Sequence, residues 1–96
     1  MTRRIADELS EELVMFMWAR IDELKAHSDG HMDYLQVFEL KPMVDDLGQT
    51  KQVIIHRSEQ PAYEQGYMLS MANPEEAKVF VIDSGDYSTM MLAEEY

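Results

Sequence analysis

The side chains best suited to acid–base chemistry are His56, Arg57 and Glu59, which follow an apolar segment of the chain. A histidine beside a carboxylate at the end of a strand can act as a general base. The same residues are also explained without any activity, by a half-buried histidine bonded to a backbone carbonyl beside a surface Arg–Glu pair. We therefore take His56, Arg57 and Glu59 only as the candidate polar site.

A second group of possible metal ligands alternates along the chain: His27, Asp29, His31 and Asp33. Imidazole and carboxylate together suit zinc or nickel. A structural zinc site needs four ligands fixed in a tetrahedron, however, and this group spans a helix end and a turn that contains glycine. No zinc-finger or His-Glu-x-x-His spacing supports it. We expect a solvated loop here, with no bound metal and no cofactor.

Other catalytic and ligand-binding patterns are missing from the sequence. There is no cysteine, which excludes thiol catalysis and cysteine-bound zinc. No serine lies in a Gly-x-Ser-x-Gly elbow, and no glycine-rich phosphate loop is present. Residues 83–86 (Asp-Ser-Gly-Asp) lack the further ligands of a calcium loop and predict a hairpin turn. The sequence therefore favours a protein that is not an enzyme.

Composition narrows the class of protein further. The chain has 96 residues, of which 46% are hydrophobic and 28% charged, which fits one globular domain over residues 1–96. Its net charge of −11 opposes direct binding to nucleic-acid phosphates. No apolar run approaches the roughly 18 residues of a membrane helix, and the first residues do not resemble a signal peptide. We expect a cytoplasmic protein that binds neither nucleic acid nor membrane.

The elements that would position these groups follow from hydrophobic periodicity. Residues 10–26 have the i, i+3, i+4 spacing of a buried helical stripe, which includes Trp18, and Ser10 is the expected N-cap. Residues 33–41 alternate as a strand that Pro42 should help to end. Residues 51–57 form a second strand that is apolar on both faces, so we expect a central strand covered on two sides.

The rest of the chain predicts more strands. Residues 58–66 contain a proline and predict a loop or short helix, whereas residues 67–71 predict an edge strand. Residues 78–83 and 88–93 flank the turn and predict a hairpin. Residues 3–5 could add a short edge strand. The fold class expected is α+β, with one long N-terminal helix packed on a four- to five-stranded, mainly antiparallel sheet.

Methionine is abundant, with nine residues, and its flexible side chain suits adaptable contacts. Met15 and Phe16 lie outside the helical stripe, and Met90 and Met91 are neighbours on a strand, so they cannot share a face. We take these four residues as candidate contacts with a protein partner. A contact between two copies through the helix face that bears Phe16 would make a homodimer. Alternatively, methionines fill gaps in the core and residues 58–67 cover Phe16.

Several segments carry a resemblance to a known family: residues 33–40 (DYLQVFEL), residues 54–57 (IIHR) with Glu59 and Pro61, residues 79–83 (VFVID) through 90–96 (MMLAEEY), and Trp18. On these residues the chain resembles an uncharacterised family of small proteins from Gram-positive bacteria and their phages, the domain of unknown function 960. The resemblance implies a small α+β domain in a bacterial or phage setting. It implies no activity.

Two functions remain in view from the sequence. The first is a non-enzymatic, acidic protein-binding module with a regulatory or accessory role. The alternative is an inhibitor of a nucleic-acid enzyme that imitates DNA phosphates with its carboxylates, in a phage or prophage setting. Surface charge that serves only solubility explains the same acidic residues.

Overall fold

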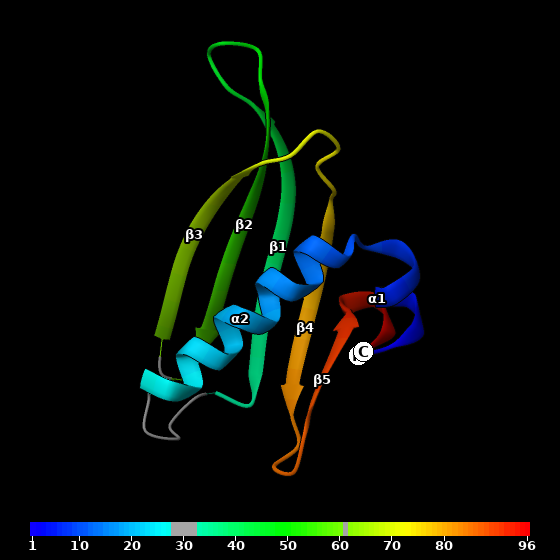
Figure 1. The fold of residues 1–96 in the computed structure, drawn as a ribbon. Coiled ribbons are helices and arrows are strands. Elements are labelled where there is room, and N and C mark those ends of the chain that lie inside the picture. Colours follow the sequence, from blue (N-terminus) through cyan, green and yellow to red (C-terminus); the bar gives the residue numbers. More distant parts are fainter. Residues whose placement is uncertain (28–32, 61) are drawn as a thin grey trace.

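Five antiparallel strands form one sheet in the order β3-β2-β1-β4-β5, with a long helix across one of its faces (Figure 1). The computed structural model describes residues 1–27, 33–60 and 62–96. The elements are α1 (Arg3–Glu8), α2 (Glu11–His27), β1 (Leu35–Val44), β2 (Thr50–Glu59), β3 (Ala62–Ser70), β4 (Ala77–Asp83), β5 (Ser88–Leu92) and the 3-10 helix η1 (Ala93–Glu95). The α+β class expected from the sequence is confirmed.

Helix α2 follows the helix expected from the sequence to within one residue at each end. The hydroxyl of Ser10 accepts a hydrogen bond from the backbone N–H of Leu13 at 3.3 Å, which caps the first turn. The buried positions on this helix recur at helical spacing and are Leu13, Val14, Met17 and Ile21. Trp18 packs against the core but is only half-buried. The apolar stripe therefore lies on the sheet.

Strand β1 does not end at Pro42 as the sequence suggested, but continues to Val44. The backbone N–H of Asp45 bonds to the carbonyl of Gln49 at 2.9 Å. In an antiparallel pair only every second residue bonds to a given neighbour. Because Asp45 bonds to the β2 side, the odd residues of β1 do so too, and the even residues turn their N–H and C=O groups away from β2. The missing N–H of Pro42 is therefore on the side of β4. Because the first residue of β4, Ala77, pairs with Leu40, no strand lies opposite Pro42 on that side and no ladder bond is lost.

The prediction of a loop or short helix over residues 58–66 is wrong. Strand β2 runs on to Glu59, and β3 pairs with it in register from Ala62 to Ser70. The expected edge strand at residues 67–71 is thus the second half of a strand of nine residues. Turn-forming residues in this segment gave a misleading signal, because β2 runs to Glu59, β3 begins already at Ala62, and Gly66 is accommodated within the strand.

The prediction of a short N-terminal edge strand is also wrong, because Arg3–Glu8 forms α1. The side chain of Thr2 caps this helix by accepting the N–H of Ile5 at 3.4 Å. The backbone N–H of Thr2 bonds to the carbonyl of Met90 on β5 at 2.9 Å. The beginning of the chain therefore closes part of the outer edge of β5 with a backbone hydrogen bond.

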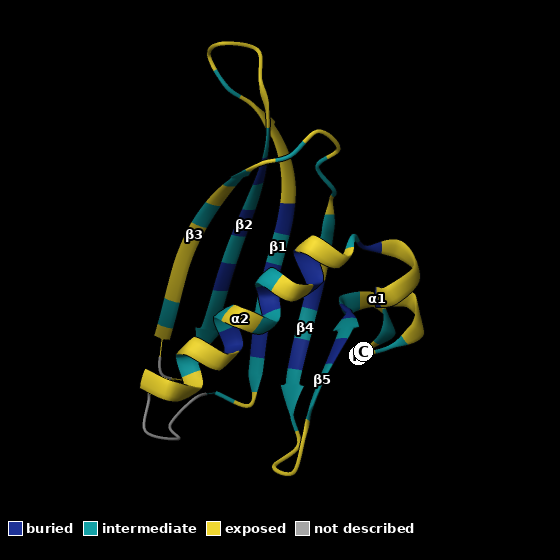
Figure 2. Cartoon of the chain, viewed as in Figure 1, coloured by how far each residue is buried: buried dark blue, intermediate teal, exposed yellow. Residues whose placement is uncertain are grey.

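The hydrophobic core lies between α2 and the face of the sheet on which α2 rests (Figure 2). We call this the covered face. Its buried apolar residues on the strands are Phe38, Leu40, Ile54, Val79, Val81, Met90 and Leu92. Strand β2 is not covered on two sides, as its apolar run had suggested: Ile54 is buried, whereas Val53 and Ile55 are half-buried on the opposite face.

Candidate functional site: the open face of the sheet

The face of the sheet opposite α2 carries an apolar patch that spans four strands. Its members alternate in sequence with the buried residues of the covered face, so they point the other way. All are half-buried, and they are Leu35, Val37, Val53, Ile55, Phe80, Ile82 and Met91. The register places them together: Val37 is opposite Phe80, Leu35 opposite Ile82, and Phe80 opposite Met91. We call this surface the open face.

The open face departs from the usual pattern of a two-layer protein. An antiparallel sheet that packs one face on a core commonly alternates apolar residues inside with polar residues outside. Here β1, β2 and β4 each place two apolar side chains on the outer side. Among the described residues, the aromatic ring of Tyr96 covers part of this surface, 5.6 Å from the ring of Phe80.

Cationic side chains border and interrupt the patch. By the same alternation, Lys41, Lys51, Arg57 and Lys78 lie on the open face, and they are four of the eight lysines and arginines in the chain. Arg57 Nη2 binds Glu39 Oε1 at 2.5 Å, and Lys78 Nζ lies 5.9 Å from the centre of the Phe80 ring. The strands also place Glu39, Glu59 and Glu64 on this face, so its charges nearly balance, whereas the chain as a whole is strongly acidic.

One end of the open face is hollowed. A cavity of about 520 Å³ is lined there by eight residues, which include Leu35, Val37 and Arg57. The carboxylate of Asp33, which also lines it, accepts the backbone N–H groups of Gln60 at 2.9 Å and Glu59 at 3.2 Å. These bonds, that of Gln60 foremost, lower the pKa of Asp33. Asp33 thus fixes the end of β2 beside the cavity as a carboxylate.

The candidate polar site of His56, Arg57 and Glu59 is not assembled. His56 is 0% exposed on the covered face, whereas Arg57 lies on the open face, because consecutive residues of a strand point in opposite directions. His56 therefore cannot act together with Arg57 on one ligand. The expectation of a half-buried histidine bonded to a backbone carbonyl is corrected too, since its partner is the side chain of Gln36.

His56 is held as a neutral side chain inside the core. Its Nε2 lies 2.7 Å from Oε1 of Gln36, whose amide nitrogen donates to the carbonyl of Asp33 at 3.0 Å. This orientation makes Nε2 the donor and leaves Nδ1 without a hydrogen-bond partner among the described residues. The ring stacks on Phe38 at 4.3 Å. Burial, followed by the positive charge of Arg20, lowers the pKa of His56 from 6.5 to about 4.

The four candidate contact residues lie in different surroundings. Met15 is 63% exposed on the outer side of α2. Phe16 is half-buried and packs edge-to-face on Tyr67 of β3 at 5.2 Å. A partner that contacted the whole Phe16 ring would have to displace Tyr67. Met90 is 0% exposed and belongs to the core, which corrects its place among the contact residues. Met91 is half-buried on the open face.

The possible metal-ligand set lies partly outside the described residues, because these do not include Asp29 and His31. Of the other two, His27 is exposed at the end of α2, and Asp33 binds backbone N–H groups as described above. Within residues 1–27, 33–60 and 62–96, no group of three or more histidine or acidic side chains is placed to hold a metal ion.

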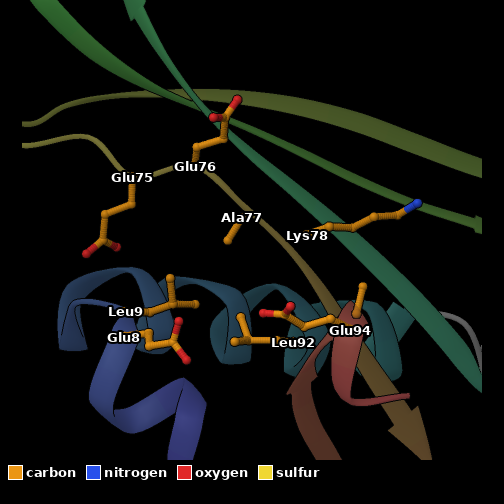
Figure 3. Close-up of a pocket in the computed structure, with 9 residues that line it drawn as sticks. Glu8, Leu9, Glu75, Glu76, Ala77, Lys78, Leu92 and Glu94 are labelled. Carbon is orange, nitrogen blue, oxygen red and sulfur yellow. The ribbon is translucent and has the colours of Figure 1, made fainter.

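Acidic side chains gather at the other end of the molecule, around a second hollow of about 520 Å³ (Figure 3). Its lining includes Glu8, Glu75, Glu76 and Glu94. Both carboxylate oxygens of Glu75 lie 3.1 Å from the backbone nitrogen of Ser10, which donates to them. Glu75 therefore also holds the start of α2 against the segment that precedes β4.

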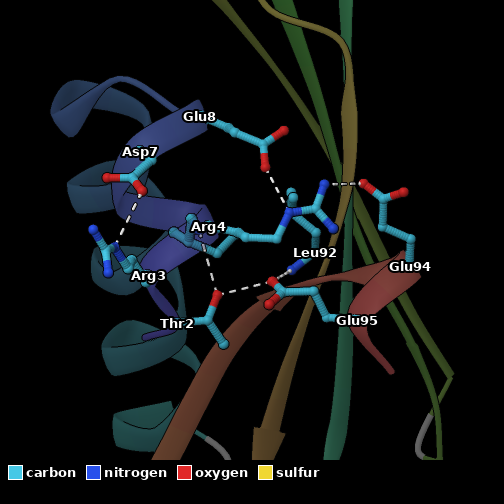
Figure 4. Close-up of polar contacts among 9 residues, drawn as sticks. Thr2, Arg3, Arg4, Asp7, Glu8, Leu92, Glu94 and Glu95 are labelled. Atoms are coloured by element: carbon cyan, nitrogen blue, oxygen red, sulfur yellow. Dashed lines mark hydrogen bonds and ion pairs between the residues drawn. The ribbon is translucent and has the colours of Figure 1, made fainter.

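Arg4 forms ion pairs with two of these carboxylates (Figure 4). Its guanidinium binds Glu8 at 2.7 Å and Glu94 at 2.5 Å, which raises the pKa of Arg4. Nearby, Glu95 accepts the backbone N–H of Leu92 at 2.9 Å and the hydroxyl of Thr2 at 2.8 Å. The bond from Leu92, more than any other group, lowers the pKa of Glu95. Several acidic residues at this end thus join α1 to η1.

Sequence reasoning missed the open face, although its signal was present. Consecutive apolar residues at 53–55 and 79–82 show that both faces of these strands are apolar. For residues 51–57 we interpreted that pattern as a strand with cover on two sides, and for residues 78–83 we drew no conclusion about cover. In the structure α2 packs on one face of the sheet only. The second apolar face, on which no helix packs among the described residues, is the feature that the pattern could have revealed.

No described helix is long and apolar enough to cross a membrane. A search of curated proteins and a search of solved structures found no match to this chain. A family model described as a staphylococcal protein of unknown function matches residues 1–95, which is nearly the whole chain. The chain therefore belongs to this family, the domain of unknown function 960 (DUF960), as its sequence resemblance had indicated.

Proposed function

We propose that the protein is a non-enzymatic binding module that docks onto another protein through the open face. The observation that carries this proposal is the apolar patch on the side of the sheet that α2 does not cover. Apolar surface left in water forgoes roughly 25 cal/mol per Å² of stabilisation. Contiguous apolar patches on soluble proteins commonly mark interaction sites.

The charges around the patch indicate the chemistry of the partner. The chain has a net charge of −11, yet four of its eight cationic residues lie on the open face. Lys41 and Lys78 form no ion pair with another described residue. Opposite charges at the rim of an interface set orientation and specificity. We therefore expect a partner surface with an apolar centre and carboxylates at its rim.

The placement of the polar residues supports a binding role over catalysis. His56 is enclosed between α2 and the sheet, and its low pKa keeps it neutral near pH 7. Arg57 is occupied by Glu39 on the other face. A general base has to come within hydrogen-bond reach of its substrate, and His56 cannot do so without opening the core. The side chains that remain on the open face are mainly suited to contact.

A matched pair of variants tests this function. Val37→Asp places a carboxylate among the apolar residues of the open face, beside its hollowed end and opposite Arg57. Met15→Asp makes the same kind of change on the outer side of α2 and serves as the control. Proteins captured from staphylococcal lysate by the parent and by Met15→Asp, but not by folded Val37→Asp, would support the proposal. Identical capture by all three would contradict it.

The alternative function, imitation of DNA by an inhibitor of phage or prophage origin, has one supporting observation. Glu8, Glu75, Glu76 and Glu94 gather around one hollow. Its test should spare the carboxylates that hold the fold, such as Glu75. Neutralising Glu11, Glu12 and Glu76 to Gln should weaken binding to a basic nucleic-acid enzyme several-fold and flatten its salt dependence. Unchanged binding would remove this alternative.

A further inference from the structure

The two edges of the sheet are protected to very different degrees. Strand β5 has five residues, and the N–H of Thr2 bonds to its Met90 carbonyl. Strand β3 has nine residues and pairs with β2 alone. It contains no lysine, arginine or proline, and its single charged residue is Glu64. Natural proteins usually block long edge strands with such residues, with bulges or with a covering segment.

The hydrogen-bonding groups that β3 leaves free can be assigned. The odd residues of β1 form their backbone hydrogen bonds with odd residues of β2. The even residues of β2 therefore bond to β3, where their partners are odd residues. This alternation puts the odd residues of β3 in bonds to β2, and turns the N–H and C=O groups of its even residues outward. Those residues are Ala62, Glu64, Gly66, Met68 and Ser70. The carbonyl of Gly66 accepts a long bond, 3.3 Å, from the side chain of Gln65.

We propose that β3 pairs with β3 of a second copy in antiparallel register, which joins two sheets into one of ten strands. Full overlap of two strands that span Ala62–Ser70 puts the two-fold axis at Gly66. Each even residue then meets an even residue of the other copy, so the outward groups match. This register forms about ten backbone hydrogen bonds between the two strands.

The side chains of β3 are self-complementary in this register. Glu64 faces Met68 of the other copy, so the two Glu64 carboxylates do not meet. On the covered face, Tyr63 faces Leu69, which gives an aromatic–aliphatic cross-strand pair at each end of the joint. The one residue that faces its own copy is Gly66, which has no side chain. A different protein strand would need to reproduce this pattern, whereas a second copy supplies it.

Helix α2 lies over the covered face, whereas the joint forms along the edge of β3. Helix α2 crosses the covered face obliquely, and its C-terminal end lies near the start of β3 (Figure 1). Its Phe16 packs on Tyr67, beside the middle of that strand. A two-fold axis at the middle of β3 places the C-terminal ends of the two helices at opposite ends of the joint. It also keeps both helices on one side of the ten-stranded sheet. This inference does not depend on the proposed docking function, because the joint uses the backbone edge of β3, whereas docking uses apolar side chains of β1, β2, β4 and β5.

Single-cysteine variants test the register, because the chain has no cysteine of its own. The Cα atoms of the two Gly66 residues would be about 5.5 Å apart, within the range of about 4.4–6.8 Å that a disulfide spans. Those of the two Met68 residues would be offset along the strands by about 14 Å. Gly66→Cys should therefore oxidise to a linked dimer, and Met68→Cys should not. A mixture of Glu64→Cys and Met68→Cys should give a linked pair.

Sedimentation at high micromolar concentration tests the association itself, with a dimer at twice the 11.2 kDa of one chain. In a Met68→Glu dimer, each new carboxylate lies opposite Glu64 of the other copy, so two pairs of like charges repel across the joint. This variant should raise the dissociation constant about tenfold. Met68→Lys faces the same carboxylate and should not weaken the dimer. A parent that stays monomeric, or equal cross-linking of Gly66→Cys and Met68→Cys, would overturn the proposal. Val37→Asp, on the open face, should leave the dimer intact, so the two proposals can fail separately.

Discussion

Phe38 and Phe80 lie on neighbouring strands of the same sheet, one on each face. Phe38 is fully buried beneath α2 and stacks on His56, whereas Phe80 is half-buried on the open face beside Tyr96. Both faces are apolar in composition, and they differ in what lies over them. An apolar sheet face thus indicates that something can pack on it. It does not show whether the packing element belongs to the same chain.

The largest effect that we expect comes from truncating these two rings. Phe38→Ala should lower the free energy of unfolding by about 3–5 kcal/mol, because it leaves a cavity under α2. Phe80→Ala should cost only about 1 kcal/mol, because its ring is already partly in water. Urea unfolding of both variants measures the difference. Equal losses would show that the open face is covered in solution, and would end the contrast between the faces.

A smaller effect concerns His56, which the covered face keeps neutral. Its pKa is about 4 in the folded chain and near 6.5 when unfolded, so the unfolded chain binds more protons between these values. Stability should therefore fall as pH drops below 6.5, by about 2 kcal/mol between pH 7 and pH 5. The loss is complete below the folded pKa.

Comparison with a His56→Gln variant isolates this term, because the carboxylates titrate in both proteins. Urea midpoints are measured for the two proteins from pH 7 to pH 5. The stability of the variant should change less with pH over this interval than that of the parent. If both proteins respond alike, water reaches His56, and the covered face is less closed than the structure indicates.

The smallest effect that we expect concerns how far water screens the charges on the open face. Arg57 and Glu39 form an ion pair whose side chains are 40% and 21% exposed. A double-mutant cycle with Arg57→Ala and Glu39→Ala should give a coupling energy below about 1 kcal/mol, weakened by salt. A coupling well above this, insensitive to salt, would indicate that another molecule excludes water from the pair. The free monomer and any complex can be compared in this way.

Much of the fold was accessible from the sequence. Helix α2 has a regular apolar stripe and a serine cap, and the β4–β5 hairpin has apolar strands around a turn in which Gly85 takes a φ of 95°. Helix α1 was missed because it has only six residues, and its cap, Thr2, lies next to the start of the chain. The first half of β3 was missed because turn-forming residues outweighed its pairing with β2, which is a tertiary interaction.

The candidate surface was accessible only in part. Apolar residues on both faces of β2 and β4 correctly indicated that both faces of the sheet are apolar. That alternation also separates His56 from Arg57, so the polar site could have been rejected from the strand assignment alone. The absence of a second layer could not be predicted, because local periodicity does not say how many layers a chain supplies. The sequence also could not show that Met90 is buried and Met91 is not, because this depends on which face of the sheet each residue of β5 occupies.

The strand order has a kinetic consequence. Strands β1, β2 and β3 follow one another closely in the sequence and pair as neighbours, which makes a local meander. Strand β4 comes after this meander in the sequence and returns to pair with β1. Closing long loops slows folding, so we expect the meander to form early and the β4–β5 hairpin to dock late, with Thr2 joining β5 last. Until it docks, β1 presents a second free edge. Folding is then the stage at which this chain is most exposed to wrong strand pairing, and φ-values near zero in β5 with higher values in β2 would locate that stage.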